Sequence, residues 1–402
     1  MITSVERYRK RKKQRLKKDN NEHRNDEVQS LHQYPSVALV ELPEELIFSE
    51  IITRLPVNSV IRFKSVSKTW NSIISTPHFI KSHLKRTNSN PFVPTSCLFI
   101  KSAYYFYILN YAAYDRCPDE NYGEKGLTLV KSLSFYDNGV NTFLIGSCNG
   151  LVCFGRGNPF ADIDYYFHIY NPVMGQFLHV LDPLGNFQGK LIYGFGYVSS
   201  KDDYVLLIGG LQRRSYENYV YVYSLRSKDW KKIGTFDEYK FSIFMGGRGV
   251  LVNETLHWVR TQVRISNAKC ISGFDLSDET FKDVSMPKAF LGSDHFLDFS
   301  VSEMGGSLCA WAKDVYGGVE MWSLLQYGVS DSWTKLFKID MMPDLGNFYG
   351  CTENGKVLVQ TEEGSLLLAD PDQSPTEYIS LVKNLGDIEV VSYIQSPVSP
   401  FL

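Results

Sequence analysis

The sequence has no long apolar run. No stretch reaches the roughly eighteen consecutive apolar residues that a transmembrane helix needs, so we expect no membrane partner. The N-terminus also lacks the apolar core of a secretory signal peptide. Cysteine is scarce, with 7 in 402 residues and no CxxC pair. We therefore expect a reducing compartment and free, mostly buried thiols.

Patterns that indicate catalysis or metal binding are also missing. Cys148 and Cys153 lie in strand-like apolar surroundings, which favours buried, inert thiols over a thioester-forming nucleophile. His78 and His83 have no set of cysteines or carboxylates nearby, so a surface or packing role is favoured over metal binding. The pair Gly305-Gly306 lacks the Lys and Ser/Thr of a phosphate loop. We therefore predict no catalytic, cofactor or metal site, and a protein that is not an enzyme.

Positive charge is concentrated at the N-terminus. Residues 1–24 contain ten Lys and Arg against three acids, which leaves 32 basic and 41 acidic residues in the rest of the chain. The body is thus mildly acidic and offers no basic field for nucleic acid. Nine of the twelve residues in 7–18 are Lys or Arg, so we expect residues 1–38 to form a disordered tail.

Three interpretations of this tail remain open: a solvated segment, a nuclear import signal and a non-specific RNA contact. The import signal predicts a protein of the nucleus and cytoplasm. It would consist of Arg9, Lys10, Arg11, Lys12, Lys13, Arg15, Lys17 and Lys18.

A small helical domain is predicted over residues 39–86. Pro43 suits the first turn of a helix, and Pro56 disfavours helical geometry at Leu55, which ends that helix. A second short helix follows Pro56, Ser67 can cap a third, and a further helical turn restarts at Thr76-Pro77. The segment 87–95 has the composition of a linker.

This helical segment carries more apolar side chains than about fifty residues can bury. Val60, Phe63 and Ile73 are candidates for its own core. The surplus would be an aggregation hazard if left exposed, which indicates a partner protein. The predicted partner-binding residues are Leu42, Pro43, Leu46, Ile51, Leu55, Pro56, Val66 and Trp70.

Residues 96–395 show a loose repeat of about fifty residues, a period typical of propellers or solenoids, and we predict a β-propeller. A polar turn is followed by an aromatic residue at Phe177, Trp230, Phe281 and Trp333, and these positions are 53, 51 and 52 apart. An alternating strand precedes each of them. The length predicts about six blades, with the strand 388–393 as a candidate to close the ring and 396–402 as a tail.

Two groups of motifs resemble a known family. Residues 39–86 resemble the F-box of plant proteins, through Leu42-Pro43, LPV (55–57), RFK (62–64) and VSKTW (66–70). The later part resembles the F-box-associated, kelch-like domain, through GSCNGLVCF (146–154), YNPVMGQF (170–177), GFGY (194–197), DDY (202–204), GVLVNETLHWV (249–259), FDLSDETF (274–281) and SWTKLFKI (332–339). The fold class expected is an α+β multidomain protein, with a small all-α F-box domain before an all-β, kelch-like propeller.

The resemblance implies a substrate-recognition adaptor of an SCF-type ubiquitin ligase. Its F-box would bind a Skp1-like protein, and through it a cullin and a RING protein, while the propeller would bind an unidentified protein target at residues the sequence does not identify. It implies no cofactor. Two alternatives remain: a carbohydrate-binding or glycoside-acting propeller, and a Skp1-bound scaffold with no role in ubiquitination.

Overall fold

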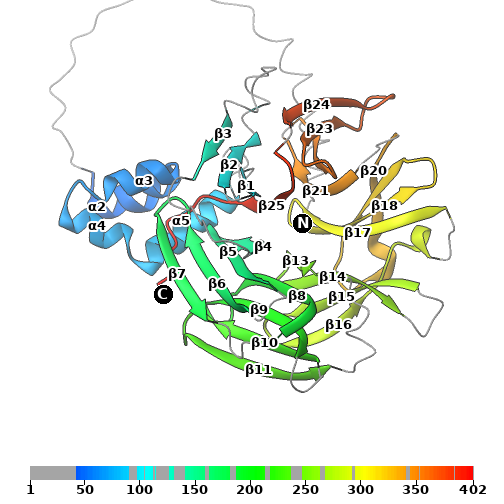
Figure 1. Cartoon of the computed structure of the whole chain (residues 1–402). Coiled ribbons are helices and arrows are strands. Elements are labelled where there is room, and N and C mark those ends of the chain that lie inside the picture. The colour runs from blue at the N-terminus through cyan, green and yellow to red at the C-terminus, as the bar shows by residue number, and fades with distance from the viewer. Residues whose placement is uncertain are drawn as a thin grey trace, which may run out of the picture. The chain divides into compact units, whose positions relative to one another are not determined.

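The computed structural model divides the chain into two compact units, Met1–Asn90 and Pro91–Leu402. It describes residues 42–89, 97–103, 105–111, 114, 126–130, 141–158, 163–181, 187–212, 218–236, 247–262, 268–291, 295–340, 345–352, 354–383 and 385–401. The predicted tail 1–38, with its import signal, lies outside the described residues. Figure 1 shows helices in the first unit and strands in the second, which confirms the predicted fold class.

The helical unit follows the predicted order of short helices. Its elements are α2 (Glu44–Leu46), the π-helical η1 (Ile47–Ile51), the 3₁₀ turn η2 (Ile52–Arg54), α3 (Val57–Phe63), α4 (Lys68–Ile74) and α5 (Pro77–Ser89). The first helical path begins after Pro43 and ends before the extended Leu55, as Pro56 predicts. Ser67 caps α4, because its side-chain oxygen accepts from the Trp70 amide at 3.1 Å. Helix α5 runs into the predicted linker 87–95.

The core of this unit is small. Its central cluster consists of five buried side chains, Phe48, Ile52, Val60, Ile74 and Phe79, and Val57 and Leu84 are also buried. The unit therefore has little apolar interior with which to hold its helices together.

In the described part of the chain, no helix has the length and apolar character needed to cross a membrane.

The second unit consists of six antiparallel blades, numbered from 1 to 6 in chain order. Blade 1 contains β25 (Ile388–Tyr393), β1 (Cys97–Ser102), β2 (Tyr105–Asn110) and β3 (Leu127–Leu129), and blade 2 contains β4 (Asn141–Cys148), β5 (Leu151–Asn158), β6 (Ile163–Asn171) and β7 (Gln176–Leu181). Blade 3 contains β8 (Phe187–Val198), β9 (Asp203–Gln212), β10 (Asn218–Ser224), β11 (Asp229–Phe236) and the short β12 (Gly247–Arg248).

The other three blades each have four strands in chain order. Blade 4 contains β13 (Val250–Val252), β14 (Thr255–Gln262), β15 (Ala268–Asp275) and β16 (Thr280–Val284), and blade 5 contains β17 (Phe296–Met304), β18 (Ser307–Asp314), β19 (Val319–Leu324) and β20 (Trp333–Ile339). Blade 6 contains β21 (Leu345–Cys351), β22 (Val357–Thr361), β23 (Leu366–Asp370) and β24 (Glu377–Val382). The 3₁₀ turns η4 (Lys288–Phe290) and η5 (Ser330–Ser332) complete the elements described.

The innermost strands close the ring. Strands β25, β4, β8, β13, β17 and β21 contact one another in turn, and β21 returns to β25 (Figure 1). The C-terminal strand β25 pairs antiparallel with β1, so the two ends of the propeller sequence share blade 1. The carboxylate of Glu389 on β25 accepts from the Leu144 amide of blade 2 at 2.6 Å and from Lys101 Nζ at 2.9 Å. Both the closing strand and the blade number are as predicted.

The apolar core lies between neighbouring blades. One cluster joins side chains of blade 3, such as Leu207 and Val220, to side chains of blade 4, such as Leu256 and Phe274. Gly194 permits this approach, because a Cβ there would lie 2.5 Å from Leu256 Cδ1. Every blade needs the face of its neighbour, which explains why strand β10 is buried on both sides.

The repeated aromatic residues begin outer strands and hold blades together. Phe177, Trp230, Phe281 and Trp333 lie at the start of β7, β11, β16 and β20. The indole N–H of Trp230 donates to the carbonyl of Leu181 in the preceding blade at 2.8 Å, and that of Trp333 donates to the Ser285 carbonyl at 2.9 Å. The repeat found in the sequence therefore marks contacts between blades.

The residues after β25, predicted as a tail, pack on blade 2 as far as Val398. The side-chain amide of Asn171 donates to the carbonyls of Ser396 at 2.9 Å and Val398 at 2.6 Å. Ser396 is fully buried, and Gly150 leaves room for it, because a Cβ at that position would clash with the Ser396 side chain. This segment adds a second link between the chain's end and the propeller.

Candidate functional site

Four of the predicted partner-binding residues are strongly exposed apolar side chains. Leu42 is 58% exposed, Leu46 48%, Ile51 46% and Val66 58%. The first three belong to the path that begins before α2 and runs through η1, and Val66 lies in the turn between α3 and α4. We call these four residues the apolar F-box surface. Four large apolar side chains exposed within twenty-five residues of each other, in a unit with a small core, mark this region as a candidate interface.

The other predicted residues divide between surface and core. Pro43 and Pro56 are exposed and precede α2 and α3. Leu55 and Trp70 are half-buried and pack against the unit's own core. The Trp70 ring lies 5.0 Å from that of Phe48, so Trp70 is largely an internal residue here.

The residues predicted for the core lie where expected. Val60 is fully buried, while Phe63 and Ile73 are half-buried and pack against the core cluster. The rings of Phe63 and Trp70 meet edge to face at 5.6 Å. The apolar F-box surface is thus made of residues that the core does not use.

Charged side chains border this surface near Ile51. The Glu50 carboxylate pairs with Arg54 at 2.7 Å and with Arg86 of α5 at 3.0 Å. Hydrogen bonds from Arg54 and then Arg86 lower the pKa of Glu50. Ile51 therefore directly follows an ion-paired carboxylate that links η1 to η2 and α5.

His83 has a packing role, as one of the two interpretations predicts. It is buried, and its Nε2 donates to the Leu55 carbonyl at 3.0 Å, which ties α5 to the end of η2. Burial lowers the pKa of His83, so the neutral ring is favoured. His78 is exposed, and the described residues contain no group of three side chains suited to a metal ion.

The propeller thiols proposed as inert are poor nucleophiles. Burial raises the pKa of Cys148 to about 12 and that of Cys153 well above its ordinary value. A thiol needs the opposite shift to react as a thiolate at neutral pH.

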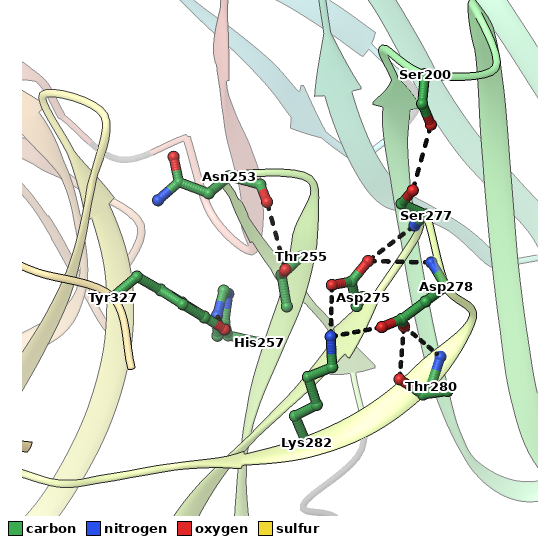
Figure 2. A network of polar contacts seen from close by, with 10 residues as sticks. All are labelled: Ser200, Asn253, Thr255, His257, Asp275, Ser277, Asp278, Thr280, Lys282 and Tyr327. Carbon is green, nitrogen blue, oxygen red and sulfur yellow. Dashed lines mark hydrogen bonds and ion pairs between the residues drawn. The ribbon is translucent and has the colours of Figure 1, made fainter. Parts of the chain in front are cut away.

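Figure 2 shows a polar network on the turns of blades 3 and 4. Lys282 Nζ lies 2.7 Å from Asp275 Oδ2 and 2.6 Å from Asp278 Oδ2, and Asp275 Oδ1 accepts from the Ser277 amide at 2.9 Å. The hydroxyls of Ser200 and Ser277 join the two blades at 3.2 Å. Each carboxylate is occupied by a turn or an ion pair, so the network is suited to stabilising turns rather than to acid–base catalysis.

His257, also in Figure 2, links blades 4 and 5. Its Nδ1 lies 3.0 Å from the Val250 carbonyl, and its Nε2 lies 2.8 Å from the Tyr327 hydroxyl. A carbonyl can only accept, so Nδ1 carries the proton and Nε2 accepts from Tyr327. Burial lowers the pKa of His257 to about 4, which favours this neutral form. His257 therefore has a structural role at the contact between blades 4 and 5.

Comparison with known families matches both units. The F-box domain family matches residues 39–82, and the F-box associated beta propeller domain family matches residues 119–399. The second match covers more than half of the chain. The fold and the apolar F-box surface thus define an F-box protein with a β-propeller. The chain belongs to the plant F-box proteins that carry an F-box-associated domain.

Curated relatives from Arabidopsis thaliana agree with this family. F-box protein CPR1 is 26% identical over 77% of this chain and 76% of its own length. F-box protein At3g07870 is 28% identical over 82% and 83%, and F-box/kelch-repeat protein At3g23880 is 28% identical over 81% and 87%. F-box proteins of this kind are generally adaptors in SCF ubiquitin ligases.

Proposed function

We propose that this protein is a substrate-recognition adaptor of an SCF ubiquitin ligase. Its F-box binds a Skp1-like protein, which connects it to the cullin and the RING protein, and its propeller binds the protein target. The observation that carries this proposal is the apolar F-box surface, with four large apolar side chains between 46% and 58% exposed.

The exposed side chains of the apolar F-box surface would be stabilised by contact with a second protein. Removal of apolar area from water, at about 25 cal/mol per Å², is the main driving force of such contacts. Among the described residues, the core of the helical unit is formed without Leu42, Leu46 and Val66. Helices of a second protein can bury these exposed side chains. The fixed φ of Pro43 before α2 restrains the backbone next to Leu42.

The experiment that tests the proposal is a binding measurement with purified proteins. Leu42→Ala combined with Pro43→Ala removes an exposed part of the surface while leaving the core untouched. We expect capture of a purified Skp1-like protein by the full chain to fall at least about tenfold. The matched control is Leu181→Ser, which changes a side chain 69% exposed on β7 of the propeller.

Capture at wild-type strength by the double variant would contradict the proposal. Equal loss in Leu181→Ser would show that any change of an exposed leucine lowers capture. Circular dichroism of each variant shows whether a loss of binding comes from a loss of fold.

We further propose that the basic residues within 7–18 act as a nuclear import signal, which gives a distribution between nucleus and cytoplasm. The charge run of this segment supports the proposal. Deleting residues 1–24 is expected to move a fluorescent fusion of the chain from nucleus to cytoplasm. An unchanged distribution would leave the segment as a solvated tail.

A further inference from the structure

The last described residues of the chain pack on the propeller without regular secondary structure. Strand β25 ends at Tyr393, and residues 394–401 contain no helix or strand. We call residues 394–401 the C-terminal strap. Its middle is buried, with Ser396 0% and Val398 3% exposed. A segment at the end of a chain can leave its place by local opening, while the strand before it stays folded.

Two turns of blade 2 hold the strap in place. At the end of β6, the side-chain amide of Asn171 donates to the carbonyls of Ser396 at 2.9 Å and Val398 at 2.6 Å. At the turn between β4 and β5, Ser396 Oγ donates to the Asn149 carbonyl, and it also accepts from the Val398 amide at 3.2 Å. Opening of the strap breaks these few polar contacts and exposes the buried Pro397 and Val398.

The strap carries the sequence pattern that proline-directed protein kinases phosphorylate. It contains Ser396-Pro397 and Ser399-Pro400, two Ser-Pro pairs three residues apart. A residue before proline favours extended backbone, which is the form in which a peptide fits a kinase cleft. The chain has one further pair, Ser374-Pro375, in an exposed turn of blade 6. Ser374 and Ser396 both follow a glutamine, so they differ mainly in burial.

The closed strap has no room for a phosphate at Ser396. A Cβ at Gly150 would lie 2.7 Å from the Ser396 Cβ, so the backbone of blade 2 passes directly against this side chain. Phosphorylation adds three oxygens and a charge of about −1.5 to −2 at neutral pH. The Asn149 carbonyl, which now accepts from Ser396 Oγ, would repel that charge. A phosphorylated Ser396 therefore cannot return to its buried position.

We propose that Ser396 is a phosphorylation site that a proline-directed kinase reaches only when the C-terminal strap is open, and that the phosphate then keeps the strap off blade 2. In the transfer, Ser396 Oγ forms a bond to the γ-phosphorus of ATP, and the bond from that phosphorus to the β–γ bridging oxygen breaks. ADP leaves, and the hydroxyl proton passes to a carboxylate of the kinase. Modification thus traps a state that the unmodified chain visits by local opening. The inference concerns the propeller alone and does not depend on the adaptor function.

The test treats the full chain with a purified proline-directed kinase and magnesium ATP, and maps the phosphate by mass spectrometry. Asn171→Asp removes both donors to the strap, while its carboxylate can still accept from the Val173 and Met174 amides of the turn. We expect the rate at Ser396 to rise at least about tenfold over wild type, because the rate follows the population of the open strap. Gly150→Ala, whose Cβ displaces Ser396, should raise it as well.

Controls separate opening of the strap from loss of fold. The exposed Ser374 is an internal standard, and its rate should be the same in the wild type and in both variants. A synthetic peptide of residues 392–402 should be phosphorylated at Ser396 at least about tenfold faster than the wild-type chain, a comparison that needs no variant. Hydrogen exchange then reports the strap itself. Protection of residues 394–401 should be lost after phosphorylation and in Ser396→Glu, and largely kept in Ser396→Ala, whose small side chain fits beside Gly150.

Three outcomes would overturn the inference. The first is a Ser396 that stays unmodified in the peptide and in both variants while Ser374 is phosphorylated, since it would then not be a kinase site. The second is equal rates at Ser396 in the peptide, the wild type and the variants, which would show that the strap does not control access. The third is a phosphorylated strap with the protection of the unmodified chain, because the closed state would then accommodate the phosphate.

Discussion

The helical unit and the propeller place their apolar side chains in opposite ways. In the propeller, clusters of buried residues lie between blades, and each blade is covered by its two neighbours. In the helical unit the central core cluster has five buried residues, while Leu42, Leu46, Ile51 and Val66 remain close to half exposed or more. Most large apolar side chains of the propeller are thus covered by other blades, whereas the small helical unit leaves four of its own exposed.

Size accounts for this difference. The fraction of surface that a chain buries on folding rises with its length, so a unit of about fifty residues keeps apolar area that a larger domain would enclose. A propeller blade is no larger, but ring closure through β25 gives every blade a neighbour on both sides. The F-box thus resembles a blade without a neighbour, and under the proposed function the neighbour is a Skp1-like protein.

The largest effect is expected from removing a side chain between blades. Phe274 is fully buried in the cluster of blades 3 and 4, with its ring 4.9 Å from that of Phe281. Phe274→Ala should lower the free energy of unfolding by about 3–5 kcal/mol, because it leaves a cavity in a packed interior. Urea titration of the full chain, followed by tryptophan fluorescence, measures the change.

The control for this prediction is Leu181→Ala on the surface of the propeller, for which we expect a change within about 0.5 kcal/mol. A similar loss in both variants would mean that burial between blades does not set the propeller's stability. Burial of apolar side chains would then not explain why the propeller differs from the helical unit.

Much of the propeller could be predicted because its signals are local. A polar turn followed by Phe177, Trp230, Phe281 or Trp333 occurs once in each of blades 2 to 5, and the strand before it can be recognised without distant residues. The extra strand β12 could not be predicted, since its parallel pairing with β8 joins residues more than fifty positions apart. The packing of Ser396 against Asn171 likewise depends on a contact across the sequence, 225 positions apart.

The individual partner-binding residues of the helical unit could be predicted less well than the unit's apolar surplus as a whole. Apolar composition predicts that the helical unit has a surplus, and the exposure of Leu42, Leu46 and Val66 agrees. Composition does not say which face each residue takes, so Leu55 and Trp70 fall against the core instead. In the propeller, the exposure of Leu297 likewise has no sequence signature, because it lies at a register shift that only the paired strands reveal.

A smaller effect is expected from pH, through the histidine that links blades 4 and 5. The pKa of His257 is about 4 in the folded protein and 6.5 in the reference state, so the unfolded chain binds more protons between these values. Its contribution to stability is therefore complete above pH 6.5 and is lost as the pH falls toward 4, by at most about 1.4 kcal/mol per pH unit.

His257→Gln should flatten the pH dependence of the urea midpoint in this range. Part of it will remain, because burial also lowers the pKa of His168 to about 3. The matched control is His78→Gln, which changes an exposed histidine of the helical unit and should leave the slope intact. Equal slopes for the wild type and His257→Gln would show that the buried ring does not limit stability at low pH.

The smallest effect is expected in the helical unit, at the start of α4. Ser67→Ala removes the acceptor of the Trp70 amide and should destabilise the unit by about 1 kcal/mol. Because the core is small, this loss is a large share of the unit's stability, and amide hydrogen exchange in α4 should rise about fivefold. A Skp1-like protein that covers the apolar F-box surface would restore the protection by mass action, whereas exchange in the propeller should not change. Protection of α4 that stays equally low with saturating partner would argue that the partner does not stabilise this unit, and the contrast between the two units would then need another cause.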